Sequence, residues 1–427
     1  MIIHQPDFGR RIREIRRARG LPQSELTSET VSASYISLVE SGRRTPSVKA
    51  AKAIAERLGL RLEDLGRPPA DQHPSRMELI GRLVSARTGQ LAGDWERARD
   101  DLATLIRELT SPDAATGSEE VLWEARWELA VTLGHLGEQE ARLDVLRDLL
   151  AAPMTEHAPM IQARVLVETA RALRRMGRLS ESVNHAEQAV RITGELGVAP
   201  TDHTEALVVA VSAYAESGDW QRADALCEEL LAGTGEPVPP HVGASTLWAA
   251  GGLRRLAGRP SEALDLLNRA DALAGPGTDM ADRARLVRAR ALAALAAGEQ
   301  DSARTLIEQS RALTELLGSP SARMLQSALE CLAALRRGEA VEADRLASDI
   351  GPDTPGLPLL EQAWIGIVRA RAHRAADRPA EAEADYRWAA DRYEQLGSYR
   401  LAMETWRELH ADGADEPAAD PHGLVMP

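Results

Sequence analysis

The segment Gly258-Arg259-Pro260-Ser261-Glu262-Ala263 is one copy of a phrase that returns along most of the chain. Its pattern is a glycine, a polar or charged residue, and a small residue five positions after the glycine. The segment Gly93-Asp94-Trp95-Glu96-Arg97-Ala98 is another copy. Seven glycines keep steps of 44, 40, 41, 40, 40 and 40 residues: Gly93, Gly137, Gly177, Gly218, Gly258, Gly298 and Gly338. An eighth copy lies around Asp377 to Ala382, where we expect Ala376 to replace the glycine. A fixed period of this length indicates a repeat array.

Each glycine lies between two segments with the apolar period of an α-helix. Residues 121–136 and 140–150 form one such pair, and loops rich in Pro and Gly separate successive pairs. The alternation of apolar and polar residues that is typical of β-strands is missing. We therefore predict an all-α chain in which residues 76–411 form about eight helix pairs. A final helix, Tyr399 to Leu409, caps the array.

Small residues recur seven positions before the glycines, where two helices must approach closely: Ala86, Ala130, Ala170, Val211, Gly251, Ala291 and Cys331. With the glycine period, this pattern resembles the tetratricopeptide repeat family with lengthened loops. The resemblance implies a right-handed superhelical solenoid whose first helices line a concave groove. Carrying over the groove-facing spacing gives nine candidate ligand residues: Trp127, Arg164, Arg171, Arg174, Glu205, Trp248, Arg255, Arg285 and Arg288.

An arginine-lined groove with two tryptophans suits an acidic peptide or a small molecule that carries a carboxylate. The competing interpretation is a set of solvated helix faces, because charged side chains on repeat helices usually face water.

The charge of the chain is divided unequally. Residues 1–67, the head, hold 13 Lys and Arg against 8 Asp and Glu, whereas the rest hold 38 against 57. The net charges are therefore +5 and −19, which favours a polyanion as the partner of the head alone. Residues 68–75, with three prolines, read as a stiff linker to residues 76–411, the body. Residues 412–427 are predicted to be a disordered tail.

Five short helices are expected in the head. The first runs from Phe8 to Arg19, and the second from Pro22 to about Glu29. Ser32 caps a third helix that ends near Glu40, and Ser47 caps a fourth that ends near residue 58. A last turn lies at residues 62–65. Short helices joined by a tight turn indicate a helix-turn-helix domain.

The head resembles the lambda-repressor-like, or XRE-type, DNA-binding domain. The resemblance rests on residues 21–26 (LPQSEL), 32–47 (SASYISLVESGRRTPS) and 53–59 (AIAERLG). It implies that Gln23 donates to a phosphate, that the start of the third helix faces base edges, and that the loop after it holds the DNA backbone. Arg16 and Glu40 match a structural pair. One departure is a stretch from Leu26 to Tyr35 that is one residue short and lacks the turn glycine. The candidate DNA-binding residues are Gln23, Ser32, Ala33, Ser34, Tyr35, Ser37, Arg43, Arg44, Thr45 and Lys49.

The sequence lacks the motifs of several classes of functional site. The two lysines, Lys49 and Lys52, both lie in the head, so the body offers none for a phosphate-binding loop or a Schiff base. The His and Cys residues show no metal-ligand spacing, and Cys227 and Cys331 read as core residues. We expect a chain without enzymatic activity, cofactor, metal or membrane span, in a reducing cytoplasm.

A basic DNA-binding head on a groove-forming body predicts a transcription regulator that binds double-stranded DNA as a homodimer and responds to an effector. This architecture resembles the peptide-pheromone receptors of Gram-positive bacteria, which tend to grip the peptide backbone with groove asparagines. The two asparagines here, Asn184 and Asn268, lie in second helices. The effector therefore stays open between a peptide and a small molecule. The alternative function is a protein-interaction scaffold that the head localises to DNA, and an enzyme acting on DNA has almost no support.

Overall fold

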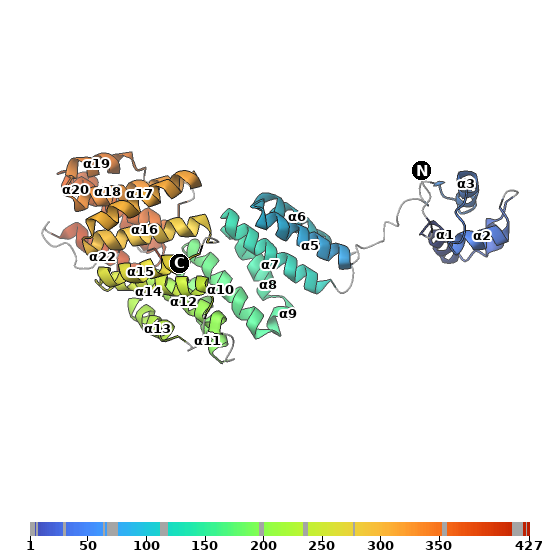
Figure 1. The fold of residues 1–427 in the computed structure, drawn as a ribbon, viewed down its shortest axis with the longest axis horizontal. Helices are drawn as coiled ribbons and strands as arrows, with labels where there is room; N and C mark the ends of the chain where they lie inside the picture. Colours follow the sequence, from blue (N-terminus) through green and yellow to red (C-terminus); the bar gives the residue numbers. More distant parts are fainter. Residues whose placement is uncertain are drawn as a thin grey trace. The chain divides into compact units, whose positions relative to one another are not determined.

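The structure is a computed structural model that describes residues 5, 7–28, 31–62, 65, 76–111, 118–195, 200–233, 238–275, 278–351, 357–411, 422–423 and 425–427. The predicted linker and most of the predicted tail lie outside these residues. By internal contacts the chain divides into two compact units. One comprises Met1–Gly81 with Asp113–Ala115, and the other comprises Arg82–Pro112 with Thr116–Pro427 (Figure 1).

The head contains α1 (Asp7–Ala18), a 3-10 helix η1 (Gln23–Leu26), α2 (Ala33–Glu40) and α3 (Val48–Arg57). The two predicted caps are confirmed: the Ser32 hydroxyl accepts from the Tyr35 amide and the Ser47 hydroxyl from the Ala50 amide. The helices enclose a small core whose fully buried members are Ile12, Leu26, Ile36, Val39, Ala51 and Ile54.

The second element of the head is shorter than predicted. It ends at Leu26 because Thr27 adopts an extended conformation, and the Thr27 hydroxyl donates to the Ser24 carbonyl at 2.6 Å. Ser28 and Val31 then exchange two backbone hydrogen bonds, of 3.0 and 3.1 Å, in an isolated antiparallel bridge. This bridge occupies the stretch that lacks the usual turn glycine.

The described part of the body consists of helices, which confirms the all-α prediction, and it contains the eight predicted pairs (Figure 1). A single turn, α9 (Pro153–Glu156), follows the second pair, and α22 (Tyr399–His410) closes the array. The pairs are α5 (Arg76–Leu91) with α6 (Trp95–Leu109), α7 (Glu119–Leu136) with α8 (Gln139–Leu150), α10 (Pro159–Arg175) with α11 (Leu179–Glu195), α12 (Pro200–Ser217) with α13 (Trp220–Ala232), α14 (Pro240–Leu256) with α15 (Pro260–Leu273), α16 (Met280–Ala297) with α17 (Gln300–Leu317), α18 (Pro320–Arg336) with α19 (Ala340–Asp349), and α20 (Leu359–Ala375) with α21 (Pro379–Gln395).

The seven periodic glycines end the first helix of each pair in the same way. All have a left-handed backbone, with φ between 70° and 86°. The amide after each glycine donates to the carbonyl five residues before it, as from Glu138 to Leu133 at 3.0 Å and from Arg259 to Arg254 at 2.9 Å. This arrangement stops one helix and starts the return of the chain, and glycine adopts it without steric cost.

The eighth copy corrects one sequence assignment. Ala376 has a φ of −94°, whereas Asp377 has a φ of 60°. The Arg378 amide donates to the His373 carbonyl at 2.9 Å, so Asp377 takes the place of the glycine. The phrase therefore begins one residue later than Ala376. Aspartate tolerates the left-handed conformation better than most residues that carry a Cβ.

Replacing Asp377 by glycine is expected to stabilise the body by about 1 kcal/mol, because the left-handed conformation strains a side-chain-bearing residue. Ala376→Gly is the matched control and should destabilise by up to about 1 kcal/mol, since its backbone needs no glycine. Chemical denaturation of the two variants should move the midpoint in opposite directions. A lower midpoint for Asp377→Gly would contradict the assignment.

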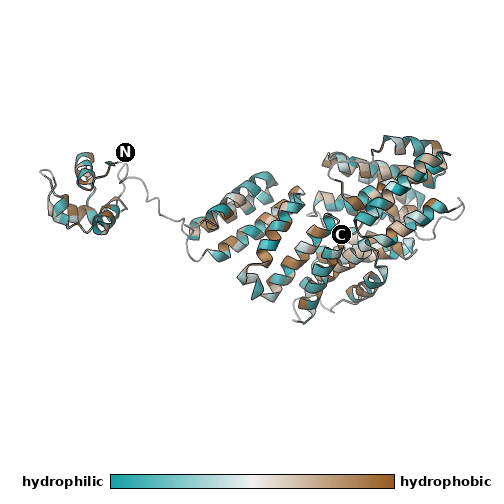
Figure 2. Cartoon of the chain, turned by 180° about the vertical axis from the view of Figure 1, so that it is seen from behind, coloured by the Kyte–Doolittle hydropathy of each residue, from teal (hydrophilic) through white to brown (hydrophobic). Residues whose placement is uncertain are grey.

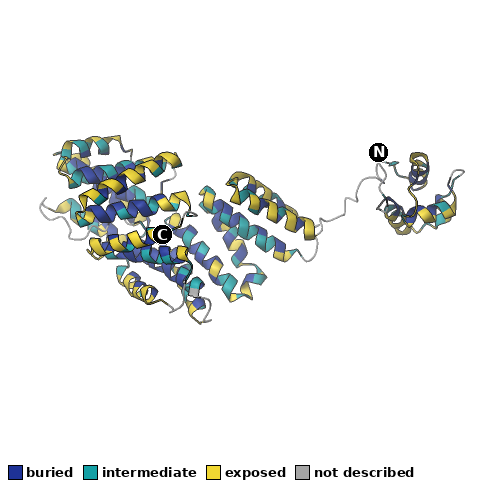
Figure 3. Ribbon diagram, in the orientation of Figure 1, coloured by how far each residue is buried: buried dark blue, intermediate teal, exposed yellow. Residues whose placement is uncertain are grey.

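The first helices form an inner layer. Contacts join α10 to α12, α12 to α14, α14 to α16, α16 to α18, and α18 to α20. The small residues before the glycines permit close approach of the second helix of the same pair: Ala170, Val211, Ala291 and Cys331 are fully buried, and a Cβ on Gly251 of α14 would lie 2.8 Å from Leu267 Cγ of α15. Apolar and buried residues follow the helix faces that meet their neighbours (Figures 2 and 3).

The end of the body returns to its third and fourth repeats. The Ser398 hydroxyl donates to the Glu216 carbonyl at 2.7 Å, across 182 residues of sequence. The Arg400 guanidinium lies 3.9 Å from the centre of the Trp220 ring, and Leu179 belongs to the same apolar cluster as Tyr386 and Leu401. The segment from α10 to α22 therefore closes on itself and encloses the inner layer.

Two further observations concern the described residues. Their helices include none that is long and apolar enough to cross a membrane. Both cysteines are buried and unbridged, and burial raises the pKa of the Cys227 thiol to about 11 and that of the Cys331 thiol to about 12.

Candidate DNA-binding face and effector groove

The start of α2 presents small polar side chains to solvent. Ala33, Ser34 and Ser37 are exposed, as the prediction of base contacts requires. Ser32 is exposed too, but its hydroxyl is engaged as the helix cap and lies 3.0 Å from the Ser34 hydroxyl. Small side chains of this kind read a groove through hydroxyl hydrogen bonds or contact with thymine methyl groups.

A basic loop follows α2 on the same domain. Arg43, Arg44 and Thr45 of this loop are exposed, as is Lys49 in the first turn of α3. The Arg44 guanidinium lies 4.8 Å from the centre of the half-buried Tyr35 ring. The side-chain amide of Gln5, a residue that the sequence analysis missed, donates to the carbonyls of Arg44 at 2.8 Å and Val39 at 3.2 Å. These contacts fix the basic loop beside α2.

A buried ion pair joins three elements of the head. Arg16 of α1 donates to Glu40 of α2 at 2.6 and 3.0 Å, and to the Leu21 carbonyl at 2.7 Å. Gln23 of η1 donates to the same carboxylate at 2.8 Å, and a primary amide has a second hydrogen left for a phosphate. Burial opposes ionisation of Glu40, but the hydrogen bonds from Arg16 and Gln23 outweigh it and lower the pKa of Glu40 below its usual value.

Glu40→Gln should destabilise the head by about 2 to 4 kcal/mol, because it leaves the buried Arg16 guanidinium without its counter-charge. In the full chain, hydrogen exchange of α1 and α2 should accelerate strongly, while the body serves as internal reference. Glu25→Gln, on exposed η1, is the matched control. Because the folded-state pKa of Glu40 is lowered, its contribution is present above about pH 4.5 and is lost as pH falls through the folded-state pKa. Unchanged exchange in Glu40→Gln would refute the role of the pair.

The structure brings three of the nine predicted groove residues to one point. Arg174 of α10, Trp248 of α14 and Arg285 of α16 all donate to main-chain oxygens of residues 425–427. The Arg285 guanidinium also lies 5.5 Å from the centre of the Trp248 ring. We call the surface that these three side chains line the effector groove, after the predicted role of its residues.

The other six predicted residues are dispersed around these three side chains. Arg288 of α16 is buried and lines a small cavity together with Val425. Arg171 pairs with Glu168 and, at 3.6 Å, with Glu205, so two predicted residues neutralise one another. Arg164 pairs with Asp202 at 2.7 Å, and Arg255 is buried in α14. Trp127 stacks on Trp123 with ring centroids 5.7 Å apart, and it packs on the apolar cluster of Ala130 and Leu146 in the second repeat.

The effector groove is rich in buried positive charge. Burial lowers the pKa of Arg288 to about 10. Arg175, whose side chain is 46% exposed, lies 4.0 Å from Asp282 of α16. Glu216 pairs with Arg174 at 3.0 Å, and burial raises the pKa of its carboxyl group. The sequence analysis missed Arg175 and Glu216, which do not share the predicted groove-facing register.

The predicted disordered tail is wrong for its described residues. The His422 ring stacks on Tyr393 with centroids 5.5 Å apart, and its Nδ1 lies 3.0 Å from the Tyr393 hydroxyl. Val425 packs on the apolar cluster around Trp248, and Met426 is fully buried in the cluster of α12 to α14. Burial of apolar side chains and capture of main-chain oxygens hold this end of the chain. We call residues 422–427 the C-terminal strap; Leu424 lies outside the described residues.

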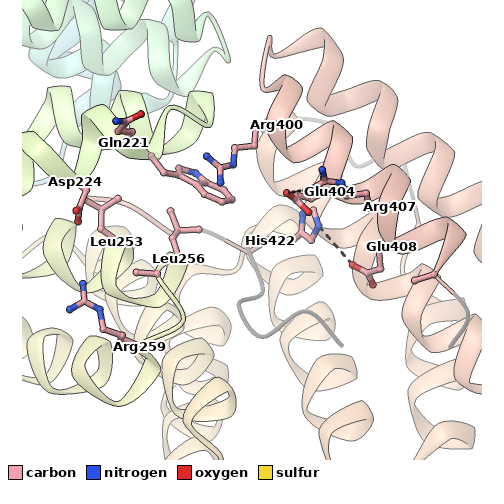
Figure 4. Close-up of a pocket in the computed structure, with 13 residues that line it drawn as sticks. Gln221, Asp224, Leu253, Leu256, Arg259, Arg400, Glu404, Arg407, Glu408 and His422 are labelled. Carbon is pink, nitrogen blue, oxygen red and sulfur yellow. Dashed lines mark hydrogen bonds and ion pairs between the residues drawn. The ribbon is translucent and has the colours of Figure 1, made fainter. Parts of the chain in front are cut away.

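A second hollow adjoins the strap at His422. It is a cavity of about 660 Å³ whose walls come from α13, α14 and the α14–α15 turn on one side and α22 on the other (Figure 4). Arg400, Glu404, Arg407 and Glu408 project from α22, while Leu253 and Leu256 supply an apolar wall. His422 Nε2 lies 3.9 Å from Glu408. Within the described residues, no group of three or more His, Cys, Asp or Glu suits a metal ion.

One family model matches the chain, and the match lies in the head. Residues 12–65 match the family model described as helix-turn-helix. The head is a helix-turn-helix domain. Its elements η1 and α2 stand in the order of the two members of such a motif. In helix-turn-helix domains in general, the second member lies in the major groove. No curated protein sequence matches the chain.

Solved structures resemble the chain at low identity. The Rap protein in complex with competence and sporulation factor has a TM-score of 0.51 at 14% identity, over 84% of this chain and 91% of its own. The apo quorum sensor NprR from B. thuringiensis has a TM-score of 0.45 at 13% identity, over 84% and 92%. PlcR from Bacillus thuringiensis, in complex with the peptide PapR7 and DNA, has a TM-score of 0.34 at 14% identity, over 63% and 94%. The Rap likeness shows a shared fold of helical repeats.

Proposed function

We propose that the chain is a sequence-specific transcription regulator whose body binds a peptide effector. The observation that carries this proposal is the capture of three main-chain oxygens by Arg174, Trp248 and Arg285, in a chain whose head is a helix-turn-helix domain. A groove that grips main-chain oxygens suits a peptide better than a small molecule, because the peptide bond supplies a carbonyl at every residue. The Rap protein, which shares the fold, is complexed with competence and sporulation factor.

The head supports binding to double-stranded DNA. Its exposed arginines and its two exposed lysines supply attraction to phosphates, while the hydroxyls at the start of α2 supply limited base readout. Half-sites one helical turn apart are normally bound by dimers, so we also propose a homodimer formed through the body. We also propose that this regulator works in the cytoplasm and has no enzymatic activity.

Purified full-length protein should protect an inverted repeat upstream of its own gene or neighbouring genes in a footprint across a salt series. Protection of two half-sites about one turn apart, weakening steeply with salt, is the expected result. The proposal would be contradicted by a lack of protection at low salt, both without peptide and with a peptide that has the sequence of residues 422–427. That result would favour the scaffold function.

The double substitution Arg43→Ala and Arg44→Ala should weaken binding on every DNA sequence and reduce the salt slope by about 2, because two phosphate contacts are lost. Fluorescence anisotropy at several salt concentrations measures both quantities. Arg269→Ala with Arg304→Ala removes the same charge from exposed positions of the body and should leave the slope unchanged. An equal loss in both double variants would show that net charge alone, rather than the basic loop, determines the affinity.

A further inference from the structure

We propose that the C-terminal strap is the resident occupant of the effector groove, and that an effector peptide binds by displacing it. This inference rests on the proposed function and adds the occupant, the residues that hold it and the chemistry of the peptide that replaces it. Four observations carry it: the main-chain contacts, the buried side chains of the strap, its glycine, and the closure of the body around it.

The main-chain contacts come from three different helices. The Trp248 indole nitrogen donates to the Val425 carbonyl at 2.8 Å, and Arg285 donates to the Met426 carbonyl at 2.5 Å. Arg174 donates to the main-chain oxygen of Pro427 while it also holds Glu216. Three consecutive oxygens are therefore satisfied by three side chains, none of which depends on the identity of the residue that it holds. This is how a groove binds the backbone of an extended peptide.

Side-chain burial supplies selectivity at two positions. Met426 is 0% exposed and belongs to a cluster with Val211, Leu253 and Leu256, whereas Val425 packs on the cluster that contains Trp248 and Trp364. The displacing peptide therefore needs apolar side chains at the two positions that correspond to Val425 and Met426. A charged side chain at the Met426 position would be buried without a partner, which is costly.

Gly423 fixes the path of the strap before it reaches these sites. Its φ of 68° is left-handed, and a Cβ added there would lie 2.6 Å from the Trp364 indole nitrogen. Any residue other than glycine would clash with the wall of the effector groove and also strain the backbone. His422, stacked on Tyr393 of α21, anchors the strap at the last repeat. The strap therefore runs from α21 to the sites on α14, α16 and α10.

Tethering makes the strap a strong competitor. The strap and the effector groove belong to one chain, so the strap binds as an intramolecular ligand, for which effective concentrations are on the order of millimolar. A free peptide with the same contacts must compete against that concentration. An effector that displaces the strap therefore needs contacts that the strap does not make. When a substitution releases the strap, a free peptide with the strap sequence is sufficient to bind.

The test uses full-length protein and a labelled hexapeptide, His-Gly-Leu-Val-Met-Pro, acetylated and amidated at its ends so that no terminal charge contributes. Two substitutions release the strap by different means and leave the walls of the effector groove unchanged: Gly423→Val through a clash and Met426→Asp through a buried charge. Fluorescence anisotropy should show at least about tenfold tighter binding to both variants than to the unsubstituted chain, because the competitor is gone.

Controls separate binding in the effector groove from binding elsewhere. A control peptide with Asp in place of Met should bind the two variants no more tightly than it binds the unsubstituted chain. Adding Trp248→Phe to Met426→Asp should weaken binding about tenfold, since the peptide loses one donor. Circular dichroism verifies that each variant keeps the helical content of the unsubstituted chain. Equal binding to all full-length proteins, or no binding to either folded variant, would overturn the proposal. Because the assay contains no DNA, failure of the regulator hypothesis would leave its outcome unaffected.

Discussion

The left-handed residue at the end of each first helix is the constraint on which the body depends. It allows the amide after it to reach the carbonyl five residues back, which stops the helix and turns the chain at the same point in every repeat. The residues predicted to face the groove keep constant distances in sequence from the periodic glycines. Trp127, Trp248 and Arg288 all stand ten residues before their glycine, while Arg164, Glu205 and Arg285 stand thirteen before theirs. A period of about 40 residues therefore brings side chains from distant parts of the sequence onto one surface.

Closure of the array converts that surface into an enclosed site. The contacts of Ser398 and Arg400 with the fourth repeat bring α22 beside α13 and α14. The strap that follows α22 then lies within reach of donors on α10, α14 and α16. Burial in this enclosure strengthens each hydrogen bond to the strap and makes an unsatisfied arginine costly, so the effector groove is best stabilised when a peptide backbone fills it.

Local patterns were sufficient to predict the helix pairs of the body, the caps at Ser32 and Ser47, and the number of repeats. Of the nine predicted groove residues, three meet at one point. Local patterns failed where the outcome depended on distant partners. The assignment of a disordered tail followed from its polar residues, whereas the burial of Met426 depends on side chains such as Leu253 and Leu256, which lie 173 and 170 positions away in the sequence. The apolar run Gly423-Leu424-Val425-Met426-Pro427 was the signal that could have indicated docking. Asp377 was missed because its left-handed backbone carries no sequence mark as clear as glycine. The DNA-contact roles within the head stay predictions.

The most direct test asks whether occupancy of the effector groove changes the DNA affinity of the head. Three affinities for the footprinted DNA site are compared: that of the unsubstituted chain, that of the full-length Met426→Asp variant, and that of the same variant with the strap-sequence peptide. If the effector groove controls the head, release of the strap should change the affinity at least about fivefold, within the usual range of coupling free energies, and the peptide should restore the original value. The same affinity in all three measurements, under conditions where the peptide is shown to bind, would contradict control of the head by the effector groove.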